Sequence, residues 1–152
     1  MISKHDAVNP ANETVHEKLV VWSKKYSVGI ELIDNQHREL VNLTNELFQA
    51  CLSPEKELET TFKETMSRMV EYVRFHFATE ADYLKKINFP GYQNHIMLHD
   101  QLVKKILDAV KDYNDGKKYV PNSFVRTLKD WVFGHIAVYD QIYASHVKDK
   151  VK

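Results

Sequence analysis

The sequence predicts an all-α fold, an up-down-up-down four-helix bundle with an N-terminal extended arm. Four long segments carry apolar residues three and four positions apart, which is the spacing of a helix that buries one face. Only 4 Gly and 4 Pro occur in 152 residues, which argues against a loop-rich or β-rich protein. Short connections make consecutive helices antiparallel neighbours. We therefore expect a single domain over residues 1–152, with the arm at 1–33 and the bundle at 34–149.

Local signals predict where each helix begins and ends. Asp34 is expected to cap the first helix, Pro54 to open the second, and Gly116 to follow the end of the third. The fourth is expected to be continuous. The arm lacks helical periodicity, but its apolar residues, such as Val20 and Trp22, predict that it packs onto the bundle. The helices are expected over residues 34–52, 54–87, 92–114 and 122–149.

Composition and charge exclude several classes of partner. Lys+Arg and Asp+Glu number 21 each, so the formal net charge is zero and offers no basic surface for nucleic acid or an anionic membrane. The sequence contains no run of 18 apolar residues, so it predicts no membrane-spanning helix. The N-terminus lacks the apolar stretch of a signal peptide. A single cysteine, Cys51, can form no internal disulfide and is expected to be a buried thiol. We expect a cytoplasmic protein with no nucleic-acid or membrane partner.

Five histidines and two acids stand out on the four predicted helices: His37, His76, Glu80, His95, His99, His135 and Asp140. Positions i and i+4 lie on one face of a helix, so His76 and Glu80 can direct two ligands to one point, as can the two histidines of the third helix. His135 and Asp140 are five residues apart, so the carboxylate must reach in from the side. Buried histidines without a partner would cost about 1–3 kcal/mol each. Bound metal would offset that cost, so we predict a metal site inside the bundle.

The balance of ligand types narrows the metal chemistry. Five imidazoles and two carboxylates exceed what one tetrahedral zinc needs, and they suit two octahedral ions that share the carboxylates and leave positions open. The sequence has no His-Glu-x-x-His motif, and its one Glu-x-x-His pair, Glu13 with His16, lies in the arm, unlike in carboxylate-rich di-iron enzymes. The nitrogen-rich set favours reversible ligand binding over oxidation of a strong C–H bond. His5, His16 and His146 are expected to be ordinary histidines.

The order and spacing of these seven residues resemble the signature of the hemerythrin family. The lead-in to the first histidine, from Trp22 to His37, is similar as well, and so is Trp131, four residues before His135. The resemblance covers about residues 20–147 and is greatest to single-domain bacterial hemerythrins. The motifs that carry it are His37, His76-x-x-x-Glu80, His95-x-x-x-His99 and His135-x-x-x-x-Asp140.

The resemblance implies two iron ions, Fe2+ or Fe3+, joined by an oxo or hydroxo bridge. The three histidines of the third and fourth helices would hold one iron, those of the first and second helices the other, and both acids would bridge them. Dioxygen would bind at the vacant position of the two-histidine iron. Both irons would go from ferrous to ferric as a hydroperoxide forms, and release would reverse this.

An apolar pocket is expected beside the vacant position, because water and anions would otherwise displace the bound dioxygen. Val132 matches a family position where an aliphatic residue usually guards the ligand. The predicted lining residues are Leu40, Val41, Phe77, Trp131, Val132 and Ile136. Ligating histidines usually donate their outer N–H, so supporting partners are expected too. The candidates are Gln36, Glu39, Tyr72, Tyr83, Tyr139 and Tyr143.

The leading hypothesis is a binding protein that carries, stores or delivers dioxygen reversibly, and not an enzyme. Its partners would be dioxygen and an oxygen-consuming client protein, and a monomer is favoured over an oligomer. One alternative is an oxygen or redox sensor, which is disfavoured because the chain shows no signalling domain. Another is a di-iron reductase of peroxide or nitric oxide. Iron storage is disfavoured because a solitary bundle has no mineral cavity.

Overall fold

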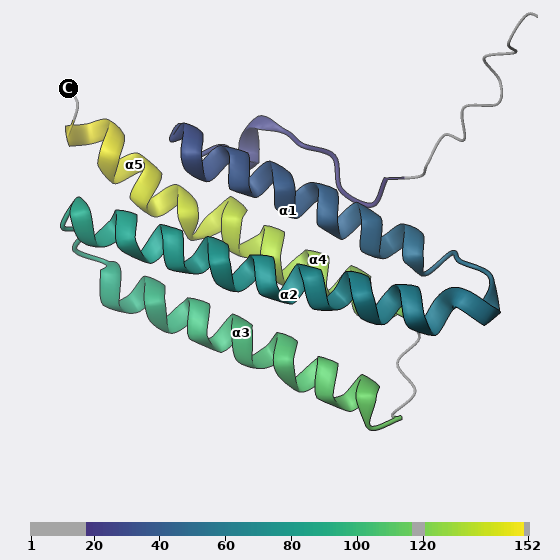
Figure 1. Cartoon of the computed structure of the whole chain (residues 1–152). Coiled ribbons are helices and arrows are strands. Elements are labelled where there is room, and N and C mark those ends of the chain that lie inside the picture. The colour runs from purple at the N-terminus through teal and green to yellow at the C-terminus, as the bar shows by residue number, and fades with distance from the viewer. Residues whose placement is uncertain (1–17, 117–120, 151–152) are drawn as a thin grey trace, which may run out of the picture.

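A computed structural model describes residues 18–116 and 121–150, and these are helical apart from the arm and the connections (Figure 1). The all-α fold is confirmed, with no strand among the described residues. None of the described helices is long and apolar enough to cross a membrane. The elements are η2 (Lys24–Tyr26), α1 (Glu31–Ala50), α2 (Glu55–Lys86), α3 (Tyr92–Asn114), α4 (Pro121–Val138) and α5 (Asp140–Lys150).

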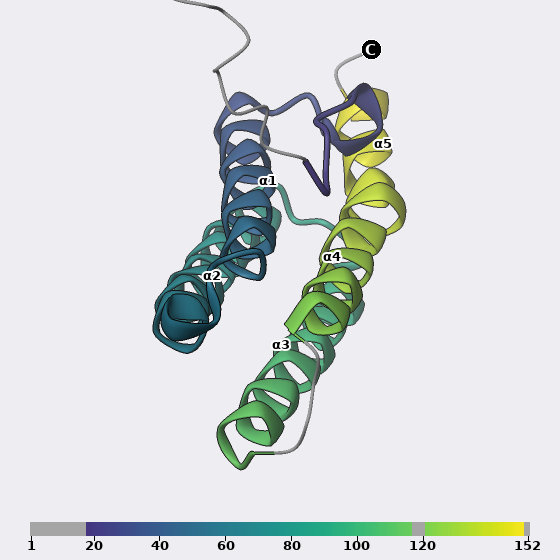
Figure 2. The same cartoon turned by 90° about the vertical axis from the view of Figure 1, so that its right-hand side faces the viewer.

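The helices run antiparallel in two pairs, α1 with α2 and α3 with the α4–α5 rod (Figure 2). The apolar core is divided into two clusters along the bundle axis. On α1, Ile33 belongs to one cluster and Leu40 to the other; on α2, Leu84 and Phe77 are divided in the same way. The buried residues between them are polar, namely Asp34, Gln36 and His37 on α1 and Glu80 on α2, so a polar layer crosses the bundle between two apolar clusters.

The first helix begins at Glu31, three residues before its predicted start, and Asp34 is not its N-cap. The carboxylate of Asp34 instead accepts hydrogen bonds from the Ser27 hydroxyl, at 2.6 Å, and the Val28 amide, at 2.7 Å. An acid in the first turn can satisfy amides that precede a helix as well as those within it. Asp34 therefore anchors the arm to α1.

The predicted fourth helix is two helices, because the chain breaks at Tyr139 between α4 and α5. The Tyr139 amide still donates to the His135 carbonyl, at 2.8 Å, but the Ile142 amide donates to the Tyr139 carbonyl three residues back, at 3.2 Å. A tightened turn of this kind changes the angular position of every residue after it. Asp140 follows this break directly and is 0% exposed, although it is five residues after His135.

The arm is tied to the bundle at both ends, as its apolar residues predict. The Asn45 side chain accepts hydrogen bonds from the Leu19 and Val20 amides, both at 2.9 Å, and donates to the Val20 carbonyl at 2.8 Å. Further along, the Gln141 amide group lies within hydrogen-bonding distance of the Lys25 carbonyl. The arm therefore spans from α1 to α5 (Figure 2). Its portion before residue 18, with His5, His16 and Glu13, lies outside the described residues.

We predict that Asn45→Ala weakens the attachment of the arm. The substitution removes three hydrogen bonds to partly buried backbone, so the free energy of unfolding should fall by about 1–3 kcal/mol. Urea denaturation of the metal-free protein measures this loss. Asn42→Ala is the matched control, because Asn42 is exposed on the same helix. Equal stability of the two variants would contradict the role of Asn45.

Candidate metal centre

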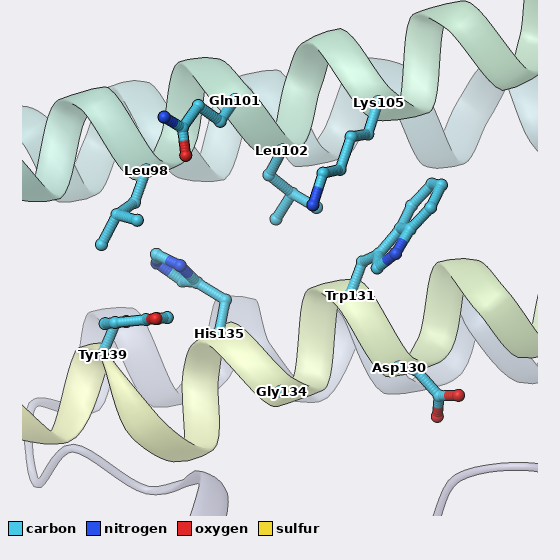
Figure 3. A pocket seen from close by; sticks show the side chains of 9 residues that line it. All are labelled: Leu98, Gln101, Leu102, Lys105, Asp130, Trp131, Gly134, His135 and Tyr139. Carbon is cyan, nitrogen blue, oxygen red and sulfur yellow. The ribbon is translucent and has the colours of Figure 1, made fainter.

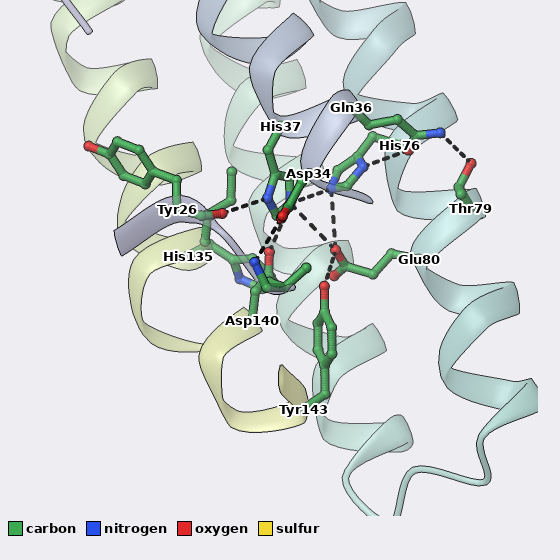
Figure 4. A network of polar contacts seen from close by, with 12 residues as sticks. Tyr26, Asp34, Gln36, His37, His76, Thr79, Glu80, His135, Asp140 and Tyr143 are labelled. Atoms are coloured by element: carbon green, nitrogen blue, oxygen red, sulfur yellow. Dashed lines mark hydrogen bonds and ion pairs between the residues drawn. The ribbon is translucent and has the colours of Figure 1, made fainter. Parts of the chain in front are cut away.

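The polar layer brings together all seven side chains that the sequence singles out. Figure 4 shows His37, His76, Glu80, His135 and Asp140 of this set. Their donor atoms form two overlapping groups, in each of which all atoms lie within 4.8 Å of one another. Glu80 and Asp140 belong to both groups. One group adds the three histidines of α3 and α4, and the other adds those of α1 and α2. The groups are Glu80, His95, His99, His135 and Asp140, and His37, His76, Glu80 and Asp140.

The layer is closed to solvent. Glu80, Asp140, His37 and His76 are 0% exposed, and the three remaining histidines are also buried. Ionised carboxylates in an apolar interior are stable only when they are paired or coordinate metals. Each helix contributes at least one donor, so the layer forms only when the bundle is assembled.

The spacing of the donor atoms fits two metal ions. Two ligand atoms about 2.1 Å from one ion and at right angles to each other lie about 3.0 Å apart. His37 Nε2 and His76 Nε2 are 3.1 Å apart, and His76 Nε2 is 3.2 Å from Glu80 Oε2. In the second group, Asp140 Oδ1 is 3.1 Å from His135 Nε2. These distances are edges of two coordination shells that share the carboxylates.

Unsatisfied polar atoms in the layer also indicate a cation. Both Asp140 oxygens, the His135 Nε2 and both ring nitrogens of His99 are buried and make no hydrogen bond in the metal-free chain. The Asp140 and His135 atoms are close enough for an ion pair, yet they are not hydrogen-bonded. Each such atom would cost about 1–3 kcal/mol if it stayed unpaired. Two metal ions that share Asp140 would satisfy four of these five atoms, leaving His99 Nδ1.

The two carboxylates change the pKa of histidines that face them. Burial lowers the pKa of His37, but its contacts with Asp140 and Glu80 outweigh burial and raise that pKa to about 9. The same balance of causes raises the pKa of His95 to about 9. Burial alone would raise the pKa of Glu80, yet close contacts with four histidines hold that pKa well below its usual value. The layer therefore keeps Glu80 charged and gathers positive charge around it.

The two-histidine group is supported on its outer side by protein acceptors (Figure 4). His76 Nδ1 lies 2.8 Å from Gln36 Oε1, and the Gln36 amide donates in turn to the Thr79 hydroxyl at 3.3 Å. His37 Nδ1 lies 3.0 Å from the Tyr26 carbonyl. Outer acceptors of this kind fix the ring and leave Nε2 free to bind metal. His99 Nδ1, by contrast, has no hydrogen-bond partner.

Two of the six predicted supporting residues contact a candidate ligand through a hydrogen bond. Gln36 does so, and the Tyr143 hydroxyl donates to Glu80 Oε2 at 3.0 Å. Tyr139 lies beside the His135 ring, and Tyr83 beside Tyr143, without a hydrogen bond to a ligand among those described. The other two predicted residues, Glu39 and Tyr72, line a surface groove.

The Tyr26 carbonyl is a functional group that sequence reasoning missed. Backbone carbonyls occur at every residue, so no residue type indicates which one will face a histidine. The Tyr26 ring packs edge-on against Phe133, with ring centroids 5.3 Å apart. This packing holds Tyr26 where its carbonyl faces His37 Nδ1.

Most of the predicted apolar lining is buried in the core cluster that adjoins the layer: Leu40, Val41, Phe77, Val132 and Ile136. The Phe77 ring stacks on the His99 ring, with centroids 3.8 Å apart and an angle of 2° between the planes. Trp131 differs from the rest, because it is half-buried and lines a surface groove between α3 and α4. The structure therefore places five of the six in the interior.

His146 lies outside both donor groups, as expected. Its ring packs edge-on against Phe89, with centroids 5.4 Å apart, in the apolar cluster at the far side of the layer. Its position on α5 is two turns beyond Asp140, too far along the helix to share an ion with that residue.

Comparisons with known proteins agree with this geometry. The family model described as hemerythrin HHE cation binding domain matches residues 28–147. A bacteriohemerythrin of Clostridium acetobutylicum is 31% identical over 131 residues, which cover 82% of this chain and 98% of that protein. A bacteriohemerythrin of Stenotrophomonas maltophilia is 28% identical over 130 residues, covering 86% and 82% of the two chains.

The fold is also that of a solved hemerythrin. A crystal structure of wild-type hemerythrin superposes with a TM-score of 0.75 at 23% identity, covering 84% of this chain and 96% of that one. The family model covers most of the chain and includes all seven converging residues. The chain therefore belongs to the hemerythrin family.

Proposed function

We propose that this chain is a non-heme di-iron protein that binds dioxygen reversibly. The observation that carries the proposal is the pair of overlapping donor groups that share Glu80 and Asp140. One group has three histidines and the other has two. An ion in the smaller group has one protein ligand fewer and so keeps a position for an external molecule.

We propose that His95, His99 and His135 hold one iron, that His37 and His76 hold the other, and that both carboxylates bridge them. An oxo or hydroxo bridge would complete the pair. Two ferrous ions would supply the electrons that reversible dioxygen binding needs. Imidazole and carboxylate donors suit iron, and the donor set contains no thiolate that would select a softer metal.

The chain's own residues position this site and keep it dry. Gln36 and the Tyr26 carbonyl fix the ring planes of the two-histidine group, and Tyr143 donates a hydrogen bond to the bridging Glu80. Burial raises the pKa of Tyr143, so its hydroxyl keeps the proton that it donates. Leu40 and Val132, which are 0% and 1% exposed, belong to the apolar cluster that would exclude water and anions from the vacant position.

The relatives support a carrier and not an enzyme, since those quoted above are named bacteriohemerythrin. The donor set agrees, because its five nitrogens outnumber the carboxylates on which oxidising di-iron enzymes depend. We further propose, on the sequence grounds given above, that the carrier acts as a cytoplasmic monomer and delivers dioxygen to a client that consumes it.

Visible absorption of the ferrous protein tests the function. Metal-free protein is loaded with Fe2+ under anaerobic conditions, exposed to air and then degassed. A charge-transfer band that appears with dioxygen and disappears on degassing is the expected result. Immediate and irreversible conversion to the ferric form would contradict a carrier and favour a sensor or a reductase of peroxide or nitric oxide.

The ligand assignment predicts which histidines are needed for iron. His76→Ala or His135→Ala should lose iron and stability together, because metal binding and folding are coupled in a site built from several helices. Iron per chain is measured after reconstitution and desalting. His146→Ala is the matched control and should retain two irons per chain. Two irons in His76→Ala or His135→Ala would contradict the assignment of that residue.

The dry lining predicts that Val132→Ala speeds autoxidation. Val132 is 1% exposed and lies one turn before His135, so its truncation should admit water or anions beside the vacant position. The rate is followed by the loss of the oxygenated band in air. Val125→Ala is the control, because Val125 is a 0% exposed valine two turns earlier on α4. Unchanged autoxidation in Val132→Ala would exclude the lining role.

A further inference from the structure

A groove of about 310 Å³ runs between α3 and α4 and ends on one of the candidate ligands (Figure 3). Leu98 and Leu102 extend into it from α3, Trp131 and Gly134 lie on the α4 side, and the His135 ring stands between them. A larger groove between the arm and α1, of about 550 Å³, has none of the seven candidate ligands in its walls. The groove between α3 and α4 is therefore a distinct approach to the metal site.

Exposure of the histidines falls from this groove inward. His135 is 6% exposed, His95 and His99 are 3% exposed, and His37 and His76 are 0% exposed. The groove therefore opens on the three-histidine group. The two-histidine group, where dioxygen is proposed to bind, is at the closed end of the layer. A solute that arrives through the groove meets His135 first.

The chemistry of the groove suits a hydrated cation better than it suits dioxygen. A hydrated metal ion cannot cross an apolar core without losing its water, whereas dioxygen is apolar and needs no polar route. Gln101, Lys105 and Tyr139 bring polar groups to the groove. The Lys105 side chain extends from α3 into the groove, and its ammonium lies 5.9 Å from the centre of the Trp131 ring (Figure 3).

One ligand of the three-histidine group is also less firmly held on its outer side than the ligands of the two-histidine group. Protein acceptors hold Nδ1 of His37 and His76, whereas Nδ1 of His99 is unpaired. Gly134 adds a second observation, since glycine destabilises a helix interior and, apart from its chain neighbours and the nearby backbone of its own helix, no atom lies within 4 Å of where its Cβ would stand. No close packing requires this glycine, and a side chain there would occupy the groove.

We infer that the groove between α3 and α4 is the route by which metal ions enter and leave the site, with His135 as the first ligand they meet. This inference rests on the proposed metal site and not on dioxygen binding. It assigns a function to Gly134 and Trp131, which the proposed dioxygen chemistry does not use. It also separates the path of the metal from the closed end of the layer.

Metal exchange in a variant with a filled groove tests the inference. Gly134→Leu places a branched side chain in the groove, and Gly134→Ala has the same helical advantage over glycine while leaving most of the groove open. Metal-free protein is mixed with Co2+, whose visible spectrum reports uptake, and the loaded protein is then mixed with EDTA to follow release. Ser67→Leu is a further control, because Ser67 lines a groove of about 370 Å³ on α2 and α3 that contains no candidate ligand.

A barrier in an access route slows metal uptake and metal release by the same factor, because it leaves the free energies of the metal-free and metal-bound states unchanged. Gly134→Leu should therefore slow uptake and release equally, by about tenfold or more, with an unchanged Kd. Gly134→Ala and Ser67→Leu should exchange metal like the unsubstituted protein.

Unchanged rates in Gly134→Leu would overturn the inference, as would faster release with a weakened Kd, which indicates damage to the site itself. If the unsubstituted protein failed to bind Co2+, the proposed metal site and this inference would both fall. A failure of reversible dioxygen binding alone would leave the inference standing, since no step of the cobalt experiment involves dioxygen.

Discussion

The rest of the structure depends on two carboxylates that are buried in an apolar bundle. Glu80 and Asp140 are 0% exposed, and a carboxylate in such surroundings is tolerated only with partners that compensate for its lost hydration. The five histidines supply those partners in the metal-free chain, and metal ions would do so in the loaded one. Because the partners come from α1, α2, α3 and α4, satisfying two acids requires the whole bundle to assemble.

The protein groups that support this polar layer are concentrated at one of its two ends. The closed end is braced by Gln36, by Tyr143 and by the carbonyl of Tyr26, which the arm holds against His37. The arm is therefore part of the site, although it contributes no ligand. The open end, at His135, has a groove instead of a brace. The supporting hydrogen bonds are concentrated at the two-histidine group, where dioxygen is proposed to bind. The groove reaches the site at His135, where metal ions are proposed to pass.

Sequence patterns predicted the helices and the converging residues well, because both depend on spacing along a helix. His76 with Glu80 and His95 with His99 are i and i+4 pairs, and these need only a regular helix to share a face. The pattern failed at Tyr139, where a break replaced the expected continuous helix. It failed also for Asp34, because an acid at a helix start can serve the preceding chain as readily as the helix. The spacing of apolar residues along the chain predicts neither the break at Tyr139 nor the role of Asp34.

The break at Tyr139 lies within the five-residue interval between His135 and Asp140. In a continuous helix, residues five apart are separated by about 140° around the axis, so both could not face one ion. The regular hydrogen-bond pattern is interrupted at Tyr139, and directly after it the Asp140 carboxylate lies 3.1 Å from His135 Nε2. The same irregularity leaves Tyr139 39% exposed at the groove. One local departure from helical geometry thus completes the shared carboxylate pair and forms part of the opening beside it.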